Sequence, residues 1–349
     1  MRAEGRGVHL AVGQSPRWGP ARLISLIAIA LVLLGGASGC ELVARAQAGV
    51  PRDDSAASQA FISWALAEVS RQSASSGVTS LQLSNDELDL TMRHGDVDQH
   101  WQAFPQDLPR MVDTQPLDIA KGTVETSKIL GDHLELDWKE FTSEISSCAQ
   151  SDIRLAGNAT WGGVMHYTAS CAHGTVTTEE WIGSWPVELQ DGLSTQYSLS
   201  TMMSDLTRLS PKRIASVEFV APDTDEQGCR AATTWRQQAA GQTGWITQTR
   251  FCYAQGSKGF LPISTGSAPP DADTLLEHPL DLTTVDPDVL AGLTAPSGLP
   301  SDQSGINRLR IAWSDRFGQQ VIEASSGDDD SPQTGWYSLS GTLLALDRA

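Results

Sequence analysis

The chain has 349 residues, and its 24 lysines and arginines stand against 42 aspartates and glutamates, a formal net charge of −18. A surface this acidic repels nucleic acid and anionic lipid headgroups, so the composition excludes binding to either by charge attraction. The length is sufficient for one large domain or two ordinary domains, each with a buried core.

A basic leader and an uncharged apolar run open the chain. Four arginines and one glutamate precede residue 23, and the stretch from Leu23 to Gly36 then carries no charge. Its fourteen residues would extend about 21 Å as a helix, less than the hydrocarbon core of a bilayer, which is about 30 Å thick. The pattern predicts an export signal that is cleaved, rather than a transmembrane helix.

The apolar run ends in small residues and a cysteine, ALVLLGGASGC at residues 30–40. Its last four residues, Ala37-Ser38-Gly39-Cys40, resemble the lipobox of bacterial membrane lipoproteins. This resemblance, confined to the signal segment, implies removal of residues 1–39, acylation of Cys40 with fatty acids such as palmitate, and a location on the extracytoplasmic face of the cell membrane. The alternative is an ordinary secretory signal cut nearby, which leaves Cys40 as an unpaired thiol.

The mature chain is predicted to begin with a tether at residues 40–52, followed by a helix. Asp53 and Asp54 offer an N-cap, and apolar residues then recur at steps of three and four until Gln72. A hairpin is expected at residues 79–93, where leucines alternate around Asn85-Asp86. Further strands are expected at residues 123–130, 134–138, 153–155, 164–171 and 175–181.

The second half of the chain is predicted to open with another helix, at Ser194 to Leu209, which Pro211 stops. A strand at residues 215–220 then leads into a hairpin. Residues 266–305 are rich in Pro, Gly, Ser and Asp, and we expect a connection there with a short helix opening at Asp286-Pro287. The last residues are expected to form a meander with strands at 309–313, 320–324 and 336–346.

Four cysteines remain after Cys40, an even number in a chain predicted to be exported, so disulfides are expected. Cys148 and Cys171 are 23 positions apart, as are Cys229 and Cys252, and both intervals have glycine-containing centres. Three connectivities are open, and the equal spacing favours two β-hairpins, each closed by its own disulfide. Each closed loop would stabilise the fold by about 3 kcal/mol. Metal ligation is the alternative, disfavoured because no C-x-x-C pair is present.

These elements predict an α+β fold, a mainly antiparallel β-sheet with two helices and two disulfide-closed hairpins. The predicted organisation is a signal peptide (1–39), a tether (40–52), a helix plus β region (53–190), a helix plus disulfide hairpin (191–265), a connection (266–305) and a C-terminal β-meander (306–349).

Two helix-then-sheet halves are one interpretation of this order, since QTGW occurs at residues 242–245 and again at 333–336. An ungapped alignment of the two cysteine loops matches few other positions, which favours coincidence.

The stretch HGDVDQH is the segment that most resembles a metal site, because His94, Asp96, Asp98 and His100 alternate along it. In an extended chain all four side chains would share one face, and imidazole with carboxylate suits zinc. The glycine and the density of charge instead favour a solvated turn. The four residues are therefore weak metal candidates, and no cofactor is predicted.

Two acidic stretches and several tryptophans are further candidates. Residues 223–228 begin like a calcium loop but lack its final glutamate, and residues 327–331 form a second acidic turn, so exposed loops are the favoured interpretation of both. Indole rings near glycines or turns are suitable platforms for sugars, although packing in the core is their more common role. These are Trp161, Trp181, Trp185, Trp245 and Trp336.

The sequence favours a non-catalytic cell-envelope lipoprotein that acts as a binding or accessory module outside the membrane. It contains no G-x-S-x-G, S-x-x-K, Walker or H-E-x-x-H motif. The expected partners are the membrane, through the lipid anchor, and an envelope protein or glycan, with no nucleic acid. The alternatives are a hydrolase of envelope polymers or a glycan-binding protein, and a carrier of an apolar ligand.

Overall fold

The protein is described here by a computed structural model, and the residues from Pro51 onward form one compact unit. The described residues are 56, 58–75, 77–131, 153–171, 179–188, 195–221, 229–239, 241–252, 263–269, 271–294, 306–326 and 333–348. Several predictions lie outside these residues: the signal peptide, Cys40, the tether, Asp53 and Asp54, the strand at 134–138, Cys148, and the acidic turns at 223–228 and 327–331.

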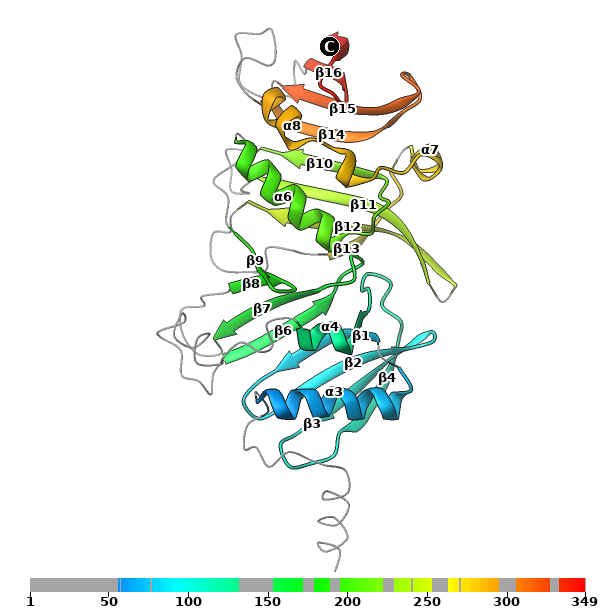
Figure 1. Ribbon diagram of the computed structural model, residues 1–349. Helices are drawn as coiled ribbons and strands as arrows, with labels where there is room; N and C mark the ends of the chain where they lie inside the picture. The colour runs from blue at the N-terminus through cyan, green and yellow to red at the C-terminus, as the bar shows by residue number, and fades with distance from the viewer. Residues whose placement is uncertain are drawn as a thin grey trace, which may run out of the picture. The chain divides into compact units, whose positions relative to one another are not determined.

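The first half of the body is one antiparallel sheet preceded by helix α3 (Gln59–Ser73) (Figure 1). Its strands are ordered β4-β3-β2-β1-β6-β7-β8-β9, and the short strand β5 also pairs with β1. The bounds are β1 Gly77–Leu83, β2 Leu88–His94, β3 Val97–Ala103, β4 Arg110–Pro116, β5 Val124–Glu125, β6 Ile153–Ala159, β7 Met165–Cys171, β8 Glu179–Ile182 and β9 Trp185–Pro186, with helix α4 at Thr126–Gly131.

The second half is another antiparallel sheet, preceded by helix α6 (Gln196–Leu209). Its strands are ordered β13-β12-β11-β10-β14-β15-β16-β17. The strand bounds are β10 Ser216–Val220, β11 Arg230–Ala239, β12 Gln242–Phe251, β13 Ile263–Gly266, β14 Ile306–Ser314, β15 Gln319–Ser326, β16 Gln333–Ser338 and β17 Leu343–Arg348. The connection between β13 and β14 contains helix α7 (Ala272–Glu277), the 3-10 turn η3 (Leu282–Thr284) and helix α8 (Pro287–Thr294).

The two sheets follow the same plan. In each, a helix precedes a four-stranded meander, a connection follows, and a second meander begins with a strand that pairs antiparallel with the first strand of the first meander. These central pairs are β1 with β6 and β10 with β14. The two helix-then-sheet halves are therefore present at the level of topology. The two QTGW segments do not mark them, because both lie in the second sheet, at the starts of β12 and β16.

Both predicted helices are confirmed, and each buries one apolar face. In α3 the N-cap is Ser58, whose hydroxyl accepts from the backbone N–H of Phe61 at 3.1 Å. The helix therefore begins at Gln59, later than expected, and Phe61, Ala65 and Val69 bury against the first sheet. In α6 the Thr195 hydroxyl caps the first turn in the same way.

The structure differs from the expected elements in several places, and it contains β4, β13 and α7, which the sequence does not predict. Residues 123–130 are a two-residue strand followed by helix α4, because Ile129 buries in the core beneath α3. The expected solvated turn at 94–100 is confined to Gly95 and Asp96, and β3 follows it. The expected strand at 336–346 is divided by a turn at Gly341, where φ is +80°.

Strand β4 forms one edge of the first sheet, and all seven of its residues are exposed. A bulge interrupts its pairing with β3 between His100 and Trp101. Arg110 and Asp113 supply charge along this edge, and the strand ends at Pro116, which has no N–H to donate. Each of these features discourages pairing with another strand.

One predicted disulfide hairpin is confirmed. Cys229 and Cys252 are bonded at the open end of the β11–β12 hairpin, whose turn contains Gly241 at φ +76°. Cys171 is also disulfide-bonded. Because Cys148 lies outside the described residues, the pairing of Cys148 with Cys171 stays a prediction.

A buried ion pair ties helix α6 to the second sheet. Arg250 on β12 is fully buried, and its Nε lies 2.9 Å from Oδ2 of Asp205, which is 4% exposed. The other guanidinium N–H groups donate to the carbonyl oxygens of Phe251 and Glu188. Burial raises the pKa of Asp205, and the charge of Arg250 opposes that rise.

Removal of one member of this pair should be costly because the other would remain buried and uncompensated. We expect Asp205→Ala to lower the free energy of unfolding by about 3–5 kcal/mol in urea denaturation. The matched control is Glu218→Ala, which breaks the partly exposed pair with Arg308 and should cost less than about 1 kcal/mol. Equal losses from the two variants would contradict this account of Asp205.

Candidate functional site

A cavity of about 330 Å³ lies where the β6–β7 turn, the end of α6 and the turn η3 come together. Its lining contains an indole ring, an ammonium, a carboxylate and several hydroxyl groups, and all of the lining residues are described. They are Trp161, Gly162, Thr207, Ser210, Pro211, Lys212, Asp281, Leu282 and Thr283.

Two backbones approach each other at the cavity without an intervening side chain. The N–H of Gly162 donates to the carbonyl of Leu209 at 3.0 Å and so satisfies a free carbonyl at the end of α6. A Cβ on Gly162 would lie 1.7 Å from the carbonyl oxygen of Arg208. Only glycine permits this contact.

A second glycine brings the loop after β4 against the same turn. The N–H of Gly122 donates to the carbonyl of Ala159 at 3.1 Å, and a Cβ on Gly122 would lie 2.1 Å from the carbonyl oxygen of Thr160. The β6–β7 turn is therefore held between the end of α6 and the segment at 118–122.

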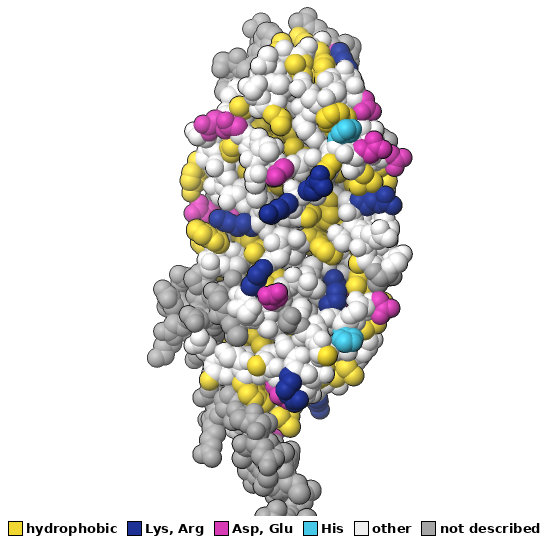
Figure 2. All heavy atoms as spheres, turned by 45° about the vertical axis from the view of Figure 1, so that its right-hand side comes forward, with side chains coloured by type: hydrophobic (Ala, Val, Ile, Leu, Met, Phe, Trp, Pro, Cys, Tyr) yellow, Lys and Arg dark blue, Asp and Glu magenta, His cyan; other side chains and the backbone are white. Residues whose placement is uncertain are grey.

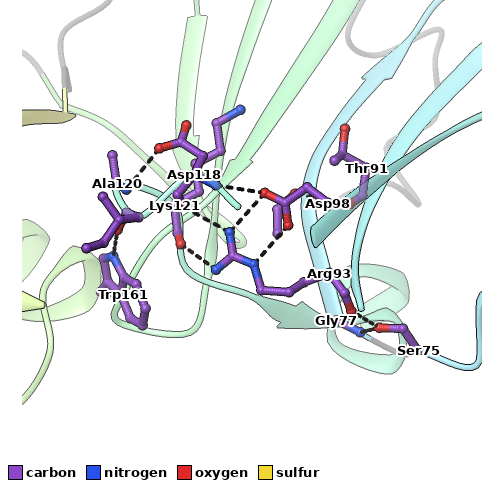
Figure 3. Close-up of polar contacts among 11 residues, drawn as sticks. Ser75, Gly77, Thr91, Arg93, Asp98, Asp118, Ala120, Lys121 and Trp161 are labelled. Carbon is purple, nitrogen blue, oxygen red and sulfur yellow. Dashed lines mark hydrogen bonds and ion pairs between the residues drawn. The ribbon is translucent and has the colours of Figure 1, made fainter. Parts of the chain in front are cut away.

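Trp161 is fixed in this turn by a hydrogen bond from its indole. Its Nε1 donates to the carbonyl oxygen of Ile119 at 3.3 Å (Figure 3). The ring is partly buried and packs, together with Ile119 and Ala120, against the core of the second sheet. Since the indole N–H is already bonded within the protein, Trp161 offers a ligand its ring surface rather than a donor.

An arginine at the end of β2 holds the segment that carries Ile119. The guanidinium of Arg93 forms a two-point ion pair with Asp98 at 2.9 and 3.1 Å. It also donates to the carbonyl oxygens of Asp118 and Lys121, both at 2.9 Å (Figure 3). Asp98 in turn accepts from the N–H of Asp118 at 3.1 Å. This network positions the partner of Trp161.

The two charged side chains of the cavity have opposite sign. The hydroxyl of Thr283 donates to Asp281 at 2.7 Å and its backbone N–H donates at 3.0 Å, and both lower the pKa of that carboxyl. The Lys212 ammonium lowers it further. Asp281 is therefore ionised at neutral pH, and it also caps η3.

The hydroxyl groups of the lining are positioned by the fold. Thr207 donates to the carbonyl of Met203 at 2.7 Å, and the hydroxyls of Ser210 and Thr233 are 2.5 Å apart. The described lining contains neither histidine nor cysteine. Its chemistry is that of hydrogen bonding and stacking with a ligand.

The four residues of the weak metal candidate do not converge. Asp98 is engaged by Arg93, and His94 ends β2. The ring of His100 lies 3.3 Å from Asp89 and 3.7 Å from Asp113. Within the described residues, no group of three or more His, Cys, Asp or Glu side chains is placed to hold a metal ion.

The tryptophans singled out from the sequence occupy different environments. Trp161 lines the cavity, whereas Trp181 and Trp245 are each 8% exposed and belong to the cores. Trp185 is 57% exposed, with the guanidinium of Arg208 4.4 Å from its ring centre. Trp336 donates to Asp347 at 2.8 Å.

Sequence reasoning missed the charged residues of the cavity. Lys212 follows the proline that stops α6, and Asp281 is two positions before a threonine, a spacing typical of a capping turn. That spacing predicts the local turn. It does not predict that the turn faces Trp161.

Comparisons with known proteins do not assign a family. No known protein family and no curated protein matches the chain. A solved structure that it is similar to is the crystal structure of Proliferating Cellular Nuclear Antigen from Entamoeba histolytica, at 10% identity. The alignment covers 81% of this chain and 95% of that one, with a TM-score of 0.14, which is too low to support any argument.

The close approach at Gly162 gives a direct test of the junction. Gly162→Ala forces the new Cβ into the backbone of α6, and we expect it to lower the free energy of unfolding by about 2–3 kcal/mol. The control is Gly292→Ala in α8, where a Cβ meets nothing within 4 Å and alanine should stabilise the helix slightly. Chemical denaturation measures the free energy of unfolding of both variants. Equal stability of Gly162→Ala and Gly292→Ala would refute the close approach of Gly162 to α6.

The cap at Asp281 should make stability depend on pH in a defined direction. The pKa of the Asp281 carboxyl in the folded protein lies below its ordinary value of 3.8. The stabilisation that this cap contributes is therefore complete above pH 3.8 and is lost as the pH falls further. We expect Asp281→Ala to cost about 0.5–1 kcal/mol at neutral pH, as measured by urea denaturation.

The same measurement below pH 3.8 should find a smaller difference between Asp281→Ala and the unmodified protein. Asp281→Asn is the matched control, because asparagine keeps a capping oxygen that does not titrate. A cost of Asp281→Ala that stays constant through acidic pH would contradict the role of the carboxylate.

Proposed function

We propose that this protein is a non-catalytic lipoprotein of the bacterial cell envelope, which binds a ligand in the cavity beside Trp161. The observation that carries the proposal is the construction of that cavity. Its wall is held by the Arg93 network and by the two backbone contacts, at Gly122 and Gly162, that only glycine permits. Its side chains offer stacking and hydrogen bonding. A pre-formed concave site with a few convergent polar groups is typical of ligand binding.

The proposed location rests on the leader and on the cysteines. The lipobox-like segment supplies a mechanism for attachment through Cys40. The disulfide between Cys229 and Cys252 fits a fold formed in an oxidising compartment, and we infer a second one between Cys148 and Cys171. None of the described helices is long and apolar enough to cross a membrane.

The lining favours a polar ligand over the apolar ligand of a carrier. Lys212 and Asp281 line the cavity and are exposed, and an apolar molecule would displace water from them without replacing its hydrogen bonds. A glycan or the side chains of an envelope protein would make those bonds instead.

Anchoring through Cys40 can be tested in a bacterial host that acylates lipoproteins. We expect the chain to incorporate an alkyne analogue of palmitate, to fractionate with membranes, and to begin at residue 40 by mass spectrometry. Cys40→Ala should abolish labelling, while the Cys229→Ser and Cys252→Ser double variant should retain it. An intact leader, or equal labelling of Cys40→Ala, would overturn the anchor.

A further inference from the structure

The charge of the cavity restricts the ligands that suit it. Lys212 and Asp281 line it together, and their formal charges cancel. An anion that approaches Lys212 meets the carboxylate of Asp281, and a cation that approaches Asp281 meets the ammonium of Lys212. On the face shown in Figure 2, lysine, arginine and acidic side chains are likewise interspersed with apolar ones. The balance favours a neutral ligand.

The polar groups require a ligand that both donates and accepts hydrogen bonds. Lys212 only donates, and ionised Asp281 only accepts. Asp281 uses Oδ1 for both bonds from Thr283, so Oδ2 has lone pairs free of these two bonds. Hydroxyl groups satisfy both partners, because each has one donor hydrogen and two lone pairs.

The indole of Trp161 adds a requirement for an apolar surface. Its N–H is bonded to the carbonyl of Ile119, which lies in the segment that Arg93 holds through the carbonyls of Asp118 and Lys121. A ring held in this way loses little conformational entropy when a flat C–H surface packs on it. The ligand therefore needs hydroxyls at its rim and C–H groups on its face.

We propose that the cavity binds a neutral carbohydrate, one sugar ring packing on Trp161 while its hydroxyls bond to Lys212 and Asp281. The volume of about 330 Å³ lies near the lower end of the range for small-molecule sites and suits a short saccharide. This inference rests on the proposed binding function and names the class of ligand for that site.

The test is isothermal titration of the disulfide-bonded mature chain with cellobiose, maltose, trehalose and N,N′-diacetylchitobiose at about 10 mM, which would saturate a site with a Kd of about 1 mM. Inorganic phosphate and tetramethylammonium serve as anionic and cationic comparators. We expect at least one saccharide to bind, and neither ion to compete with it.

The variants separate a binding role from a structural one. We expect Trp161→Leu to weaken saccharide binding about tenfold through the loss of stacking. Lys212→Met and Asp281→Asn should weaken it as well while leaving the melting temperature nearly unchanged. The control is Trp336→Leu, on β16 and outside the lining, which should bind as the unmodified protein does. If Trp161→Leu does not fold, the Lys212 and Asp281 variants carry the test.

Three results would overturn the inference: no saccharide of the panel binds, binding survives Lys212→Met and Asp281→Asn unchanged, or either ion binds in preference to the saccharides. Any of these results, obtained while palmitate still labels Cys40, refutes carbohydrate binding. The proposal of an anchored binding module then still stands. Loss of labelling with saccharide binding retained refutes the anchor instead.

Discussion

The missing side chain at Gly162 is the constraint on which the candidate site depends. It lets the β6–β7 turn reach the last carbonyls of α6, so that residues of the first half line a cavity together with residues of the second. Gly122 allows the loop after β4 to press on the same turn. Backbone contacts of this kind leave little room for adjustment, since a methyl group at either position would displace main-chain atoms. The position of Trp161 follows from both contacts.

Polar contacts then give that junction its rigidity. Arg93 uses both its charge and its planar donor geometry, so one side chain fixes Asp98 and two carbonyls of a separate loop. Arg250 plays the corresponding part for α6, where its pair with Asp205 is fully enclosed. Arg93 holds the segment that bonds to Trp161, and Arg250 holds the helix that carries Thr207. Together they hold in place the turn and the helix that form the walls of the cavity.

The periodicity of apolar residues predicted the elements that bury one face. It failed where contacts between residues distant in sequence determine the local structure. The helices α3 and α6 and the hairpin of β1 and β2 were predicted from the sequence, whereas β3 was missed because its buried Asp98 resembles a residue of a polar turn. The repeat of the two sheets was disfavoured for another reason: Cys171 ends β7 in a second meander, but Cys229 and Cys252 flank strands of a first meander. Aligning the cysteines compares positions that are not equivalent. Trp161 could be singled out by its turn, but its meeting with Lys212 and Asp281 could not, since neither neighbours it in sequence.

The exposed edge at β4 has a consequence for the anchor proposed at Cys40. Copies attached to one membrane leaflet would meet far more often than copies free in solution, and an open strand edge would then seed fibrils. The bulge opposite His100 and Trp101 and the closing Pro116 break the ladder that such growth requires. The first sheet can therefore leave an edge in water without offering a regular ladder to a neighbouring strand.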